Sequence, residues 1–207
     1  MKRWVLIVLL AAVVAAVFAV KKMPRVGGQS VVLELFTSQG CSSCPPADAL
    51  LRRIANDPSL RGRVIPLAYH VDYWNHLGWR DPFSSRAWSQ RQYEYVGAMK
   101  LNGAYTPQAV INGSRQMVGS SSFEIYRAIE EESRRKTEGS VRVRIEGRHV
   151  VVHGRSPRKD VDLIVVAFEN GATTNVTHGE NNGKSLANDA IVRKLVRVGT
   201  FTGKGDI

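Results

Sequence analysis

The amino-acid sequence predicts an α/β protein, because strand and helix patterns alternate in its first half and strand patterns dominate its second half. Residues 30–36 (SVVLELF) form a nearly continuous apolar run, which is typical of a strand buried on both faces. Residues 45–55 begin with two prolines and then place apolar side chains at helical spacing, so a helix is expected there. Residues 63–73 (RVIPLAYHVDY) show a second strand pattern. Together these elements predict a strand–helix–strand unit.

A helical insert and a hairpin are expected next. Residues 74–103 are rich in aromatic side chains, and a helix within them is expected to begin with Asp81 as its N-cap, directly before a proline. The dipeptide Asn112-Gly113 between two strand-like runs is typical of a β-hairpin turn. Residues 121–136 then predict an amphipathic helix that starts with a capping box. The first half is therefore expected to run strand, helix, strand, helical insert, hairpin and helix.

The second half of the chain, from Gly139, changes to strand patterns with a period of two. Further strands are expected at residues 161–169 and 190–199, with a long polar loop between them. We expect a small antiparallel sheet or sandwich that packs on the first half, which divides the chain into residues 29–138 and 139–207. The loop carries three polar residues close together: His178, Glu180 and Asn181. Long loops are often functional, but we interpret this one as a solvated connection without a catalytic constellation.

Residues 1–28 are expected to be a signal peptide or a membrane anchor. Two basic residues precede an uncharged apolar run over residues 4–20, and Lys21 and Lys22 follow it. A secretory signal has an apolar stretch of about 7–15 residues and a spanning helix needs roughly 17–25, so the run lies between the two classes. We favour an uncleaved anchor because the best cleavage site is poor. The expected location is extracytoplasmic, either periplasmic or secreted, with residues 4–20 as a candidate anchor in the inner membrane.

The net charge of +11 does not indicate nucleic-acid binding. Residues 1–29 carry five basic and no acidic side chains, so +5 of the total belongs to the targeting segment. The rest of the chain has no dense stripe of lysine and arginine, which is the usual footprint of nucleic-acid recognition. We therefore expect no nucleic-acid partner, and no pattern in the sequence indicates a bound cofactor.

The only two cysteines, Cys41 and Cys44, stand between the first strand and the first helix. A thiolate is the species that attacks a disulfide, and the N-terminus of a helix stabilises an anion. Cys41, just before the helix, is therefore the expected nucleophile, and Cys44 is the expected resolving thiol. Two alternatives stay open. The pair could be a structural disulfide, as is common in exported proteins, or a metal site that recruits His70, Asp72 or His76, with copper(I) as a candidate ion.

Further residues carry a resemblance to thioredoxin-like proteins. In those proteins a C-x-x-C pair also follows the first strand and opens a helix, and a cis-proline beside the disulfide begins a later strand, where this chain has Tyr105-Thr106-Pro107. Several segments resemble one branch in particular, the secreted thioredoxin-like family catalogued as domain of unknown function 1223: ELFTSQGCSSCPPAD, YHVDYWNHLGWRDPFSS, TPQAVINGSRQMVGS, HGENNGKSLAND and AIVRKLVRVGT. The resemblance covers residues 30–200. It implies a thioredoxin-like fold with a helical insert, followed by a small antiparallel β-rich extension, in an exported protein.

The resemblance also implies roles for individual residues. Pro107 is implied to be cis, which leaves the backbone of Thr106, with its neighbour Tyr105, facing the cysteines and a substrate chain. Glu34, a charged residue in the apolar first strand, is implied to be a buried carboxylate that passes a proton to the resolving thiol. The alternative for this residue is a strand-end glutamate that faces solvent. Trp74 is implied to lie over the active site and contact substrate, and the alternative is ordinary core packing.

The predicted function is thiol–disulfide exchange by an exported or membrane-anchored oxidoreductase-like protein. The expected catalytic residues are Cys41, Cys44, Pro107 and Glu34, and the expected substrate-binding residues are Thr106, Tyr105 and Trp74. The expected partners are proteins or small molecules that contain thiols or disulfides, together with the membrane through the N-terminal segment. Two alternatives remain: a thioredoxin-fold binding or chaperone-like protein without strong redox activity, and a copper-binding protein.

Overall fold

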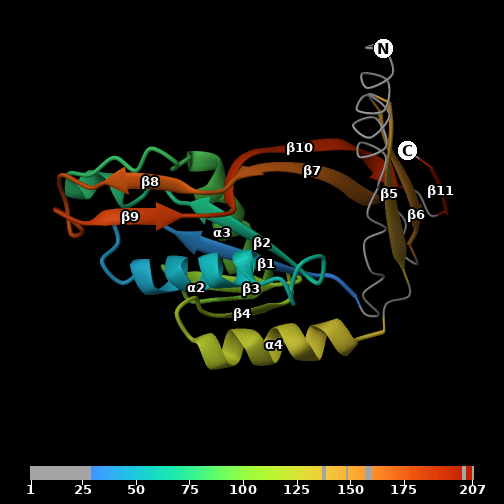
Figure 1. Ribbon diagram of the computed structural model, residues 1–207, viewed down its shortest axis with the longest axis horizontal. Coiled ribbons are helices and arrows are strands. Elements are labelled where there is room, and N and C mark those ends of the chain that lie inside the picture. Colours follow the sequence, from blue (N-terminus) through green and yellow to red (C-terminus); the bar gives the residue numbers. More distant parts are fainter. Residues whose placement is uncertain (1–28, 137–138, 148, 157–159, 202–203, 207) are drawn as a thin grey trace, which may run out of the picture.

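The computed structural model describes residues 29–207 except for residues 137–138, 148, 157–159, 202–203 and 207. Its main feature is a six-stranded mixed sheet (Figure 1), in the order β4 (Arg115–Val118), β3 (Gln108–Ile111), β1 (Val31–Thr37), β2 (Val64–His70), β10 (Ile191–Phe201) and β7 (Val161–Glu169). The predicted α/β class is confirmed. The expected signal peptide or membrane anchor lies outside the described residues. Within the described ranges, no helix is long and apolar enough to span a membrane.

The predicted strand–helix–strand unit is present as β1, α2 (Pro45–Asn56) and β2. β1 and β2 are parallel neighbours, and their pairing runs from Val31 opposite Val64 to Thr37 opposite His70. Parallel strands paired in this way have their carboxyl ends on the same side of the sheet. The residues that follow Thr37 and His70 therefore lie close together at the carboxyl ends of these strands, and the cysteines are among them.

The predicted hairpin is also confirmed. β3 and β4 pair antiparallel, and Asn112 and Gly113 form the turn with φ angles of 47° and 65°. Positive φ at both central residues is what this tight turn requires, and asparagine and glycine tolerate it best. The helix α4 (Ser122–Arg134) follows as expected. The capping-box prediction is wrong, because the side chain of Ser121 makes no cap hydrogen bond.

The helical insert consists of the short 3-10 helix η1 (Asn75–Leu77) and the helix α3 (Arg86–Ala98). The prediction that Asp81 caps the helix is wrong, because α3 begins later and Ser85 is its N-cap, whose side chain accepts a hydrogen bond from the backbone. Asp81 is instead buried and accepts the backbone N–H of Gln39. The aspartate thus links the insert to the loop that carries the cysteines.

The second half of the chain does not form one separate sheet, which corrects our expectation. Its long strands β7 and β10 pair with each other, and β10 also pairs parallel with β2 through Ile191 and Ala68, so both extend the central sheet. The physical reason is that β2 has a second edge with unpaired N–H and C=O groups, and the Ala68 N–H donates to Ala190 at 2.7 Å. The remaining strands form a three-stranded sheet of β5 (Ser140–Glu146), β6 (His149–Arg155) and β11 (Lys204–Asp206), and a hairpin of β8 (Ala172–Asn175) and β9 (Ser185–Asn188).

The core has two layers, one on each face of the central sheet. Leu33 and Leu35 of β1 pack with residues of α2 and α4, whereas Phe36 packs with Tyr69 and with Trp88 of α3. Side chains alternate along a strand, so the odd-numbered residues of β1 face α2 and the even-numbered residues face α3. This alternation decides which side chains of β1 can reach the cysteines.

Candidate functional site

Cys41 and Cys44 lie in the loop between β1 and α2, which we call the cysteine loop (residues 38–44). Cys44 is the N-cap residue of α2, and its carbonyl accepts the backbone N–H groups of Ala47 and Asp48. The prolines that follow it fit the first helical turn, where a missing N–H costs nothing. Both cysteines are free thiols, and they are 1% and 0% exposed.

The surroundings shift the pKa values of the two thiols in opposite directions. The Cys44 thiol is hydrogen-bonded to the Cys41 sulfur, and the hydroxyl oxygen of Ser43 lies 3.2 Å from it. These contacts lower the pKa of Cys41 to about 6, against the opposing effect of burial. Burial raises the pKa of Cys44 far above its usual value, and the bond to Cys41 and the charge of Asp48 add to this rise. At neutral pH Cys41 is therefore the thiolate and Cys44 the thiol.

Thr106 and Pro107 lie beside Cys41. The Thr106–Pro107 peptide bond is cis, as the resemblance implies. The carbonyl oxygen of Thr106 is 3.9 Å from the Cys41 sulfur and 3.4 Å from the hydroxyl oxygen of Ser43. The indole N–H of Trp74 donates to the hydroxyl of Thr106 at 2.8 Å, so the insert contacts the same point. The structure thus brings these predicted residues together around one sulfur.

Two predicted site residues make their contacts elsewhere. The hydroxyl of Tyr105 donates to Gln116 of β4. Glu34 is buried and forms an ion pair with Arg91 of α3 through two N···O contacts of 2.7 and 2.8 Å, and it accepts a further hydrogen bond from Tyr95. It belongs to the even-numbered face of β1, whereas α2 packs on the odd-numbered face. These contacts give Glu34 a structural role between β1 and α3 and favour neither a proton shuttle nor a solvent-facing residue.

The buried carboxylate near the cysteines comes from α2 itself. Asp48 lies one turn after Cys44 and accepts a hydrogen bond from the hydroxyl of Thr37 at 2.8 Å. Burial raises the pKa of Asp48 to about 6, although the charge of His70 acts in the opposite direction. Sequence reasoning missed this residue because an aspartate in a first helical turn is ordinarily explained by the helix dipole. The available signal was its position four residues after Cys44, on the buried face of the helix.

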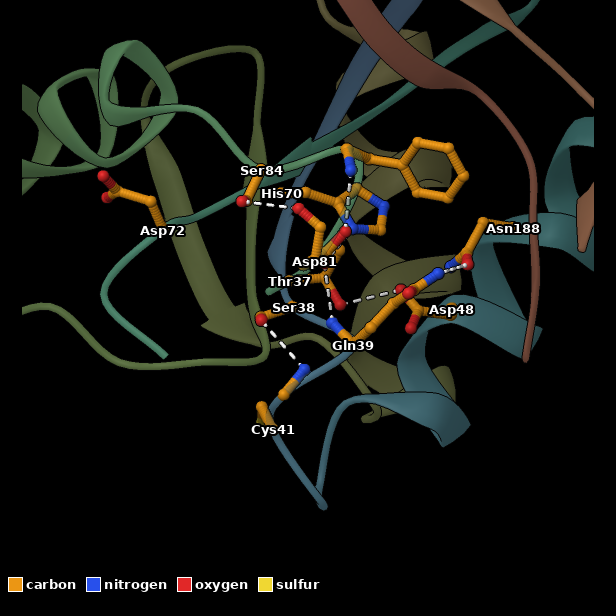
Figure 2. A network of polar contacts seen from close by, with 12 residues as sticks. Thr37, Ser38, Gln39, Cys41, Asp48, His70, Asp72, Asp81, Ser84 and Asn188 are labelled. Carbon is orange, nitrogen blue, oxygen red and sulfur yellow. Dashed lines mark hydrogen bonds and ion pairs between the residues drawn. The ribbon is translucent and has the colours of Figure 1, made fainter. Parts of the chain in front are cut away.

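A buried polar network lies behind the cysteine loop and joins β1, β2 and the insert (Figure 2). His70, at the end of β2, is 2.7 Å from Asp81, which also accepts the backbone N–H of Gln39 at 2.8 Å. The side-chain amide of Gln39 donates to Asn188 at 2.9 Å. Burial opposes the charged form of both partners, but each stabilises the other, so the pKa of His70 is raised and that of Asp81 is lowered. The network holds the backbone that leads from β1 into the cysteine loop.

The structure does not bring the hypothesised metal ligands to the thiols. His70 is bound to Asp81, Asp72 accepts a hydrogen bond from a serine of α3, and His76 contacts a backbone carbonyl of its own turn. Among the described residues, no group of three or more His, Cys, Asp or Glu side chains is arranged to hold a metal ion.

The loop of the β8–β9 hairpin contacts the cysteine loop, which corrects our interpretation of it as a solvated connection. Asn181 is fully buried, and its side-chain amide donates to the carbonyl oxygens of Gln39 and Cys41, both at 2.9 Å. The exposed carboxylate of Glu180 accepts the backbone N–H of Ser42 at 2.8 Å. These bonds join residues that are about 140 positions apart in the sequence, so no local pattern could have revealed them.

The fold and the site define a mixed α/β protein with two free cysteines at the end of its first strand, beside a cis X–Pro peptide bond. Within this class, the chain belongs to the family described as "Protein of unknown function (DUF1223)", whose profile matches residues 32–207. No protein of curated function matches the chain significantly.

Solved structures of two other proteins are similar to this one. The protein AGR_C_4864 from Agrobacterium tumefaciens is 34% identical, with a TM-score of 0.74 over 87% of this chain and 78% of that chain. HBP35 of Porphyromonas gingivalis is 14% identical, with a TM-score of 0.55 over 84% of this chain. This chain spans 58% of the length of HBP35, and the likeness to it concerns the fold alone.

Proposed function

We propose that this protein carries out thiol–disulfide exchange through Cys41 and Cys44, and that its first half has a thioredoxin-like fold with a helical insert. The observation that carries the proposal is the asymmetry of the two thiols beside the cis-proline. A thiolate with a pKa of about 6 next to a protonated second thiol suits an exchange reaction. The order of strand, helix, strand, hairpin and helix supports the proposed fold.

The proposed reaction has two steps. The Cys41 thiolate attacks one sulfur of a partner disulfide, a bond forms between Cys41 and the partner, and the other partner sulfur leaves as a thiolate. Cys44 then loses its proton, attacks the Cys41 sulfur and releases the second partner thiolate. The partner gains two electrons, and the Cys41–Cys44 pair is oxidised to a disulfide. The reverse sequence oxidises a dithiol partner.

Asp48 is the proposed acceptor of the Cys44 proton. It is buried, it lies one turn along the same helix, and its pKa of about 6 leaves the carboxylate available at neutral pH. This assignment replaces the role that the resemblance implied for Glu34. The change of residue follows from the two faces of β1, because the helix that carries Cys44 packs on the face opposite to Glu34.

The proposed setting is extracytoplasmic, with contact to the membrane through residues 4–20 and with protein or small-molecule thiols and disulfides as partners. The support is the uncharged apolar run and the basic residues on both sides of it.

A binding or chaperone-like role is the second candidate, and the burial of Cys41 favours it. Cys41 is only 1% exposed, although Ser42 and Ser43 beside it are exposed. A partner disulfide can reach the sulfur only when the surrounding structure opens locally. A protein that does not open in this way would bind partners without exchanging disulfides with them.

A redox titration of the full chain in a nonionic detergent separates these two roles. We expect a reversible Cys41–Cys44 disulfide in glutathione buffers, with a potential between about −120 and −270 mV, read by thiol alkylation and mass. A Cys44→Ala variant should accumulate mixed disulfides through Cys41, whereas the matched Cys41→Ala variant should not. A pair that forms no bond, or a bond that glutathione cannot reopen, would contradict exchange and favour the binding role.

A further inference from the structure

The β8–β9 hairpin brings a charged side chain to the amide next to Cys41. The carboxylate of Glu180 accepts the backbone N–H of Ser42 at 2.8 Å, and Glu180 itself is exposed. The nitrogen of Ser42 is bonded directly to the carbonyl carbon of Cys41. Covalent geometry therefore places the carboxylate within about 8 Å of the Cys41 sulfur.

The backbone of Glu180 is held by its neighbours in the hairpin loop. The adjacent residue Asn181 is fully buried and is held by two hydrogen bonds to the cysteine loop. Gly179 on the other side packs closely against the insert, because a Cβ atom there would lie 3.2 Å from the Cβ atom of Trp79. Its φ of 73° also favours glycine. These contacts hold the backbone of Glu180 beside the cysteine loop, and the hydrogen bond to Ser42 directs its carboxylate toward the Cys41 side.

Lys184 of the same hairpin loop carries the opposite charge. The ammonium group of Lys184 donates to the side-chain oxygen of Asn181 at 2.8 Å. Glu180 bonds the cysteine loop directly, whereas Lys184 reaches it only through Asn181. Of these two charges, the negative one is in direct contact with the cysteine loop. The buried carboxylate of Asp81 also contacts the loop, but it is paired with His70. Residues 30–207 carry a net charge of +6, which is the +11 of the whole chain less the +5 of residues 1–29, and attract anions in general. Glu180 opposes that attraction near the Cys41 sulfur.

We propose that Glu180 is a specificity-determining residue, which disfavours anionic thiols and disulfides at Cys41 relative to neutral and cationic ones. The inference rests on the proposed function, because it concerns the substrates of the same sulfur. Physiological thiols of the glutathione type carry a net negative charge and belong to the disfavoured class. Protein substrates with basic residues beside their cysteines belong to the favoured class.

Charged thiosulfonates test this selectivity without requiring a redox cycle. The reduced full chain, in a nonionic detergent, is treated with sulfonatoethyl and trimethylammonioethyl methanethiosulfonate, which are anionic and cationic. The Cys41 thiolate attacks the sulfenyl sulfur, an S–S bond forms, the bond to the sulfonyl group breaks and methanesulfinate leaves. The loss of the reduced protein is followed by mass. The ratio of the two rates cancels any change in the thiolate population, so it reports charge selectivity alone.

We expect Glu180→Gln to lower the ratio of cationic to anionic rates by about two- to six-fold at low ionic strength. Coulomb's law in water gives about six-fold between a cation and an anion at about 8 Å, and less when the reagent's charge lies farther from the carboxylate. Glutamine keeps an oxygen that can accept the Ser42 N–H. Lys184→Gln should raise the ratio by a smaller factor. Glu146→Gln, on the exposed strand β5 at the other end of the molecule (Figure 1), should leave it unchanged. The difference between Glu180→Gln and the parent chain should shrink as salt is added.

An unchanged ratio in Glu180→Gln at low salt would overturn the proposal, and so would an equal change in Glu146→Gln. Glu180→Asp, which keeps the charge, should keep the ratio near that of the parent chain. A lowered ratio in Glu180→Asp would assign the selectivity to the shape of the side chain and not to its charge. The glutathione titration addresses the exchange function separately. A protein that fails that titration but shows the expected ratios would retain the charge selectivity without the redox cycle.

Discussion

At the scale of single residues, Cys41 and Cys44 differ in proton affinity although only two residues separate them. Cys44 is enclosed at the start of α2, where burial favours the neutral thiol, and it donates its hydrogen bond to Cys41. Cys41 receives that bond and a second contact from Ser43, both of which stabilise the thiolate. This difference in proton affinity supports the proposed exchange, in which Cys41 attacks and Cys44 resolves.

Asp48→Asn should stabilise the protein above about pH 6. The pKa of Asp48 rises from 3.8 to about 6 on burial, so the folded state binds more protons than the unfolded state between these values. Stability is therefore lost as the pH rises through this window, and the full penalty is present above it. Asparagine removes the charge and keeps an oxygen to accept from Thr37. We expect a gain of roughly 1–3 kcal/mol in the free energy of unfolding at about pH 8.

Urea denaturation of both proteins at several pH values checks this expectation. The gain should fade as the pH approaches about 4, where the unfolded carboxyl group also binds its proton. A gain that is the same at every pH would show that it does not come from the ionisation of Asp48.

Gly119→Ala should disturb the cis-proline side of the site. A Cβ atom at Gly119 would lie 2.6 Å from a methyl group of Leu35 and 3.0 Å from the Cβ atom of Pro107. Overpacking of this kind costs typically about 1–3 kcal/mol. Gly103→Ala is the matched control, because its added Cβ would meet nothing within 4 Å. Equal losses of unfolding free energy in the two variants would contradict the steric explanation.

At the scale of elements, the β8–β9 hairpin is a part of the site that lies far from the cysteines in the sequence. It is formed by residues far along the chain, yet it holds the carbonyl oxygens of the cysteine loop through Asn181 and binds the side chain of Gln39 through Asn188. A loop of small residues such as the cysteine loop has few contacts of its own, so the partners that satisfy its buried polar groups come from elsewhere. The hairpin therefore acts as a fixed support for Cys41.

Asn181→Ala should destabilise the fold, because the substitution leaves two buried carbonyl oxygens without their donor. The cost of such unsatisfied groups is about 1–3 kcal/mol. The neighbouring residue Asn182 is exposed, so Asn182→Ala should change the free energy of unfolding by less than about 0.5 kcal/mol. Urea denaturation of the two variants measures both effects. A loss that is no larger for Asn181→Ala than for Asn182→Ala would show that the carbonyl groups find other donors.

At the scale of the whole molecule, the two halves of the chain share one sheet. β10 lies beside β2, and Ala190 just before it and Ile191 and Val192 at its start are buried. Ala190 packs in the core layer of α2 and α4, and Val192 packs in the layer of α3. At the same end of β10, Asp189 contacts Arg52 of α2 across a distance of 3.2 Å. We therefore expect that the boundary in composition near residue 139 is not a boundary between independently stable units.

Removal of residues 139–207 should prevent cooperative folding of the first half. The truncated chain would lose the strand that pairs with β2 and the hairpin that holds the cysteine loop, and it would expose apolar surface on both sides of the sheet. Thermal unfolding followed by circular dichroism compares this truncation with residues 29–207. A sharp transition in the shorter chain, at a temperature near that of the longer one, would show that residues 29–138 fold independently.

The sequence by itself determined the elements whose cause is local: the buried strand β1, the helix start at two prolines, the Asn-Gly hairpin and the C-x-x-C pair at the head of α2. Each depends on neighbours within a few residues, so pattern and turn chemistry are enough to predict it. The tertiary structure alone decided the rest. The contacts of Glu34 and Asp48 follow from which helices cover each face of β1, and the contacts of Asn181 and Glu180 follow from the pairing of β10 with the free edge of β2. Those choices depend on long-range packing, which no local pattern of residues records.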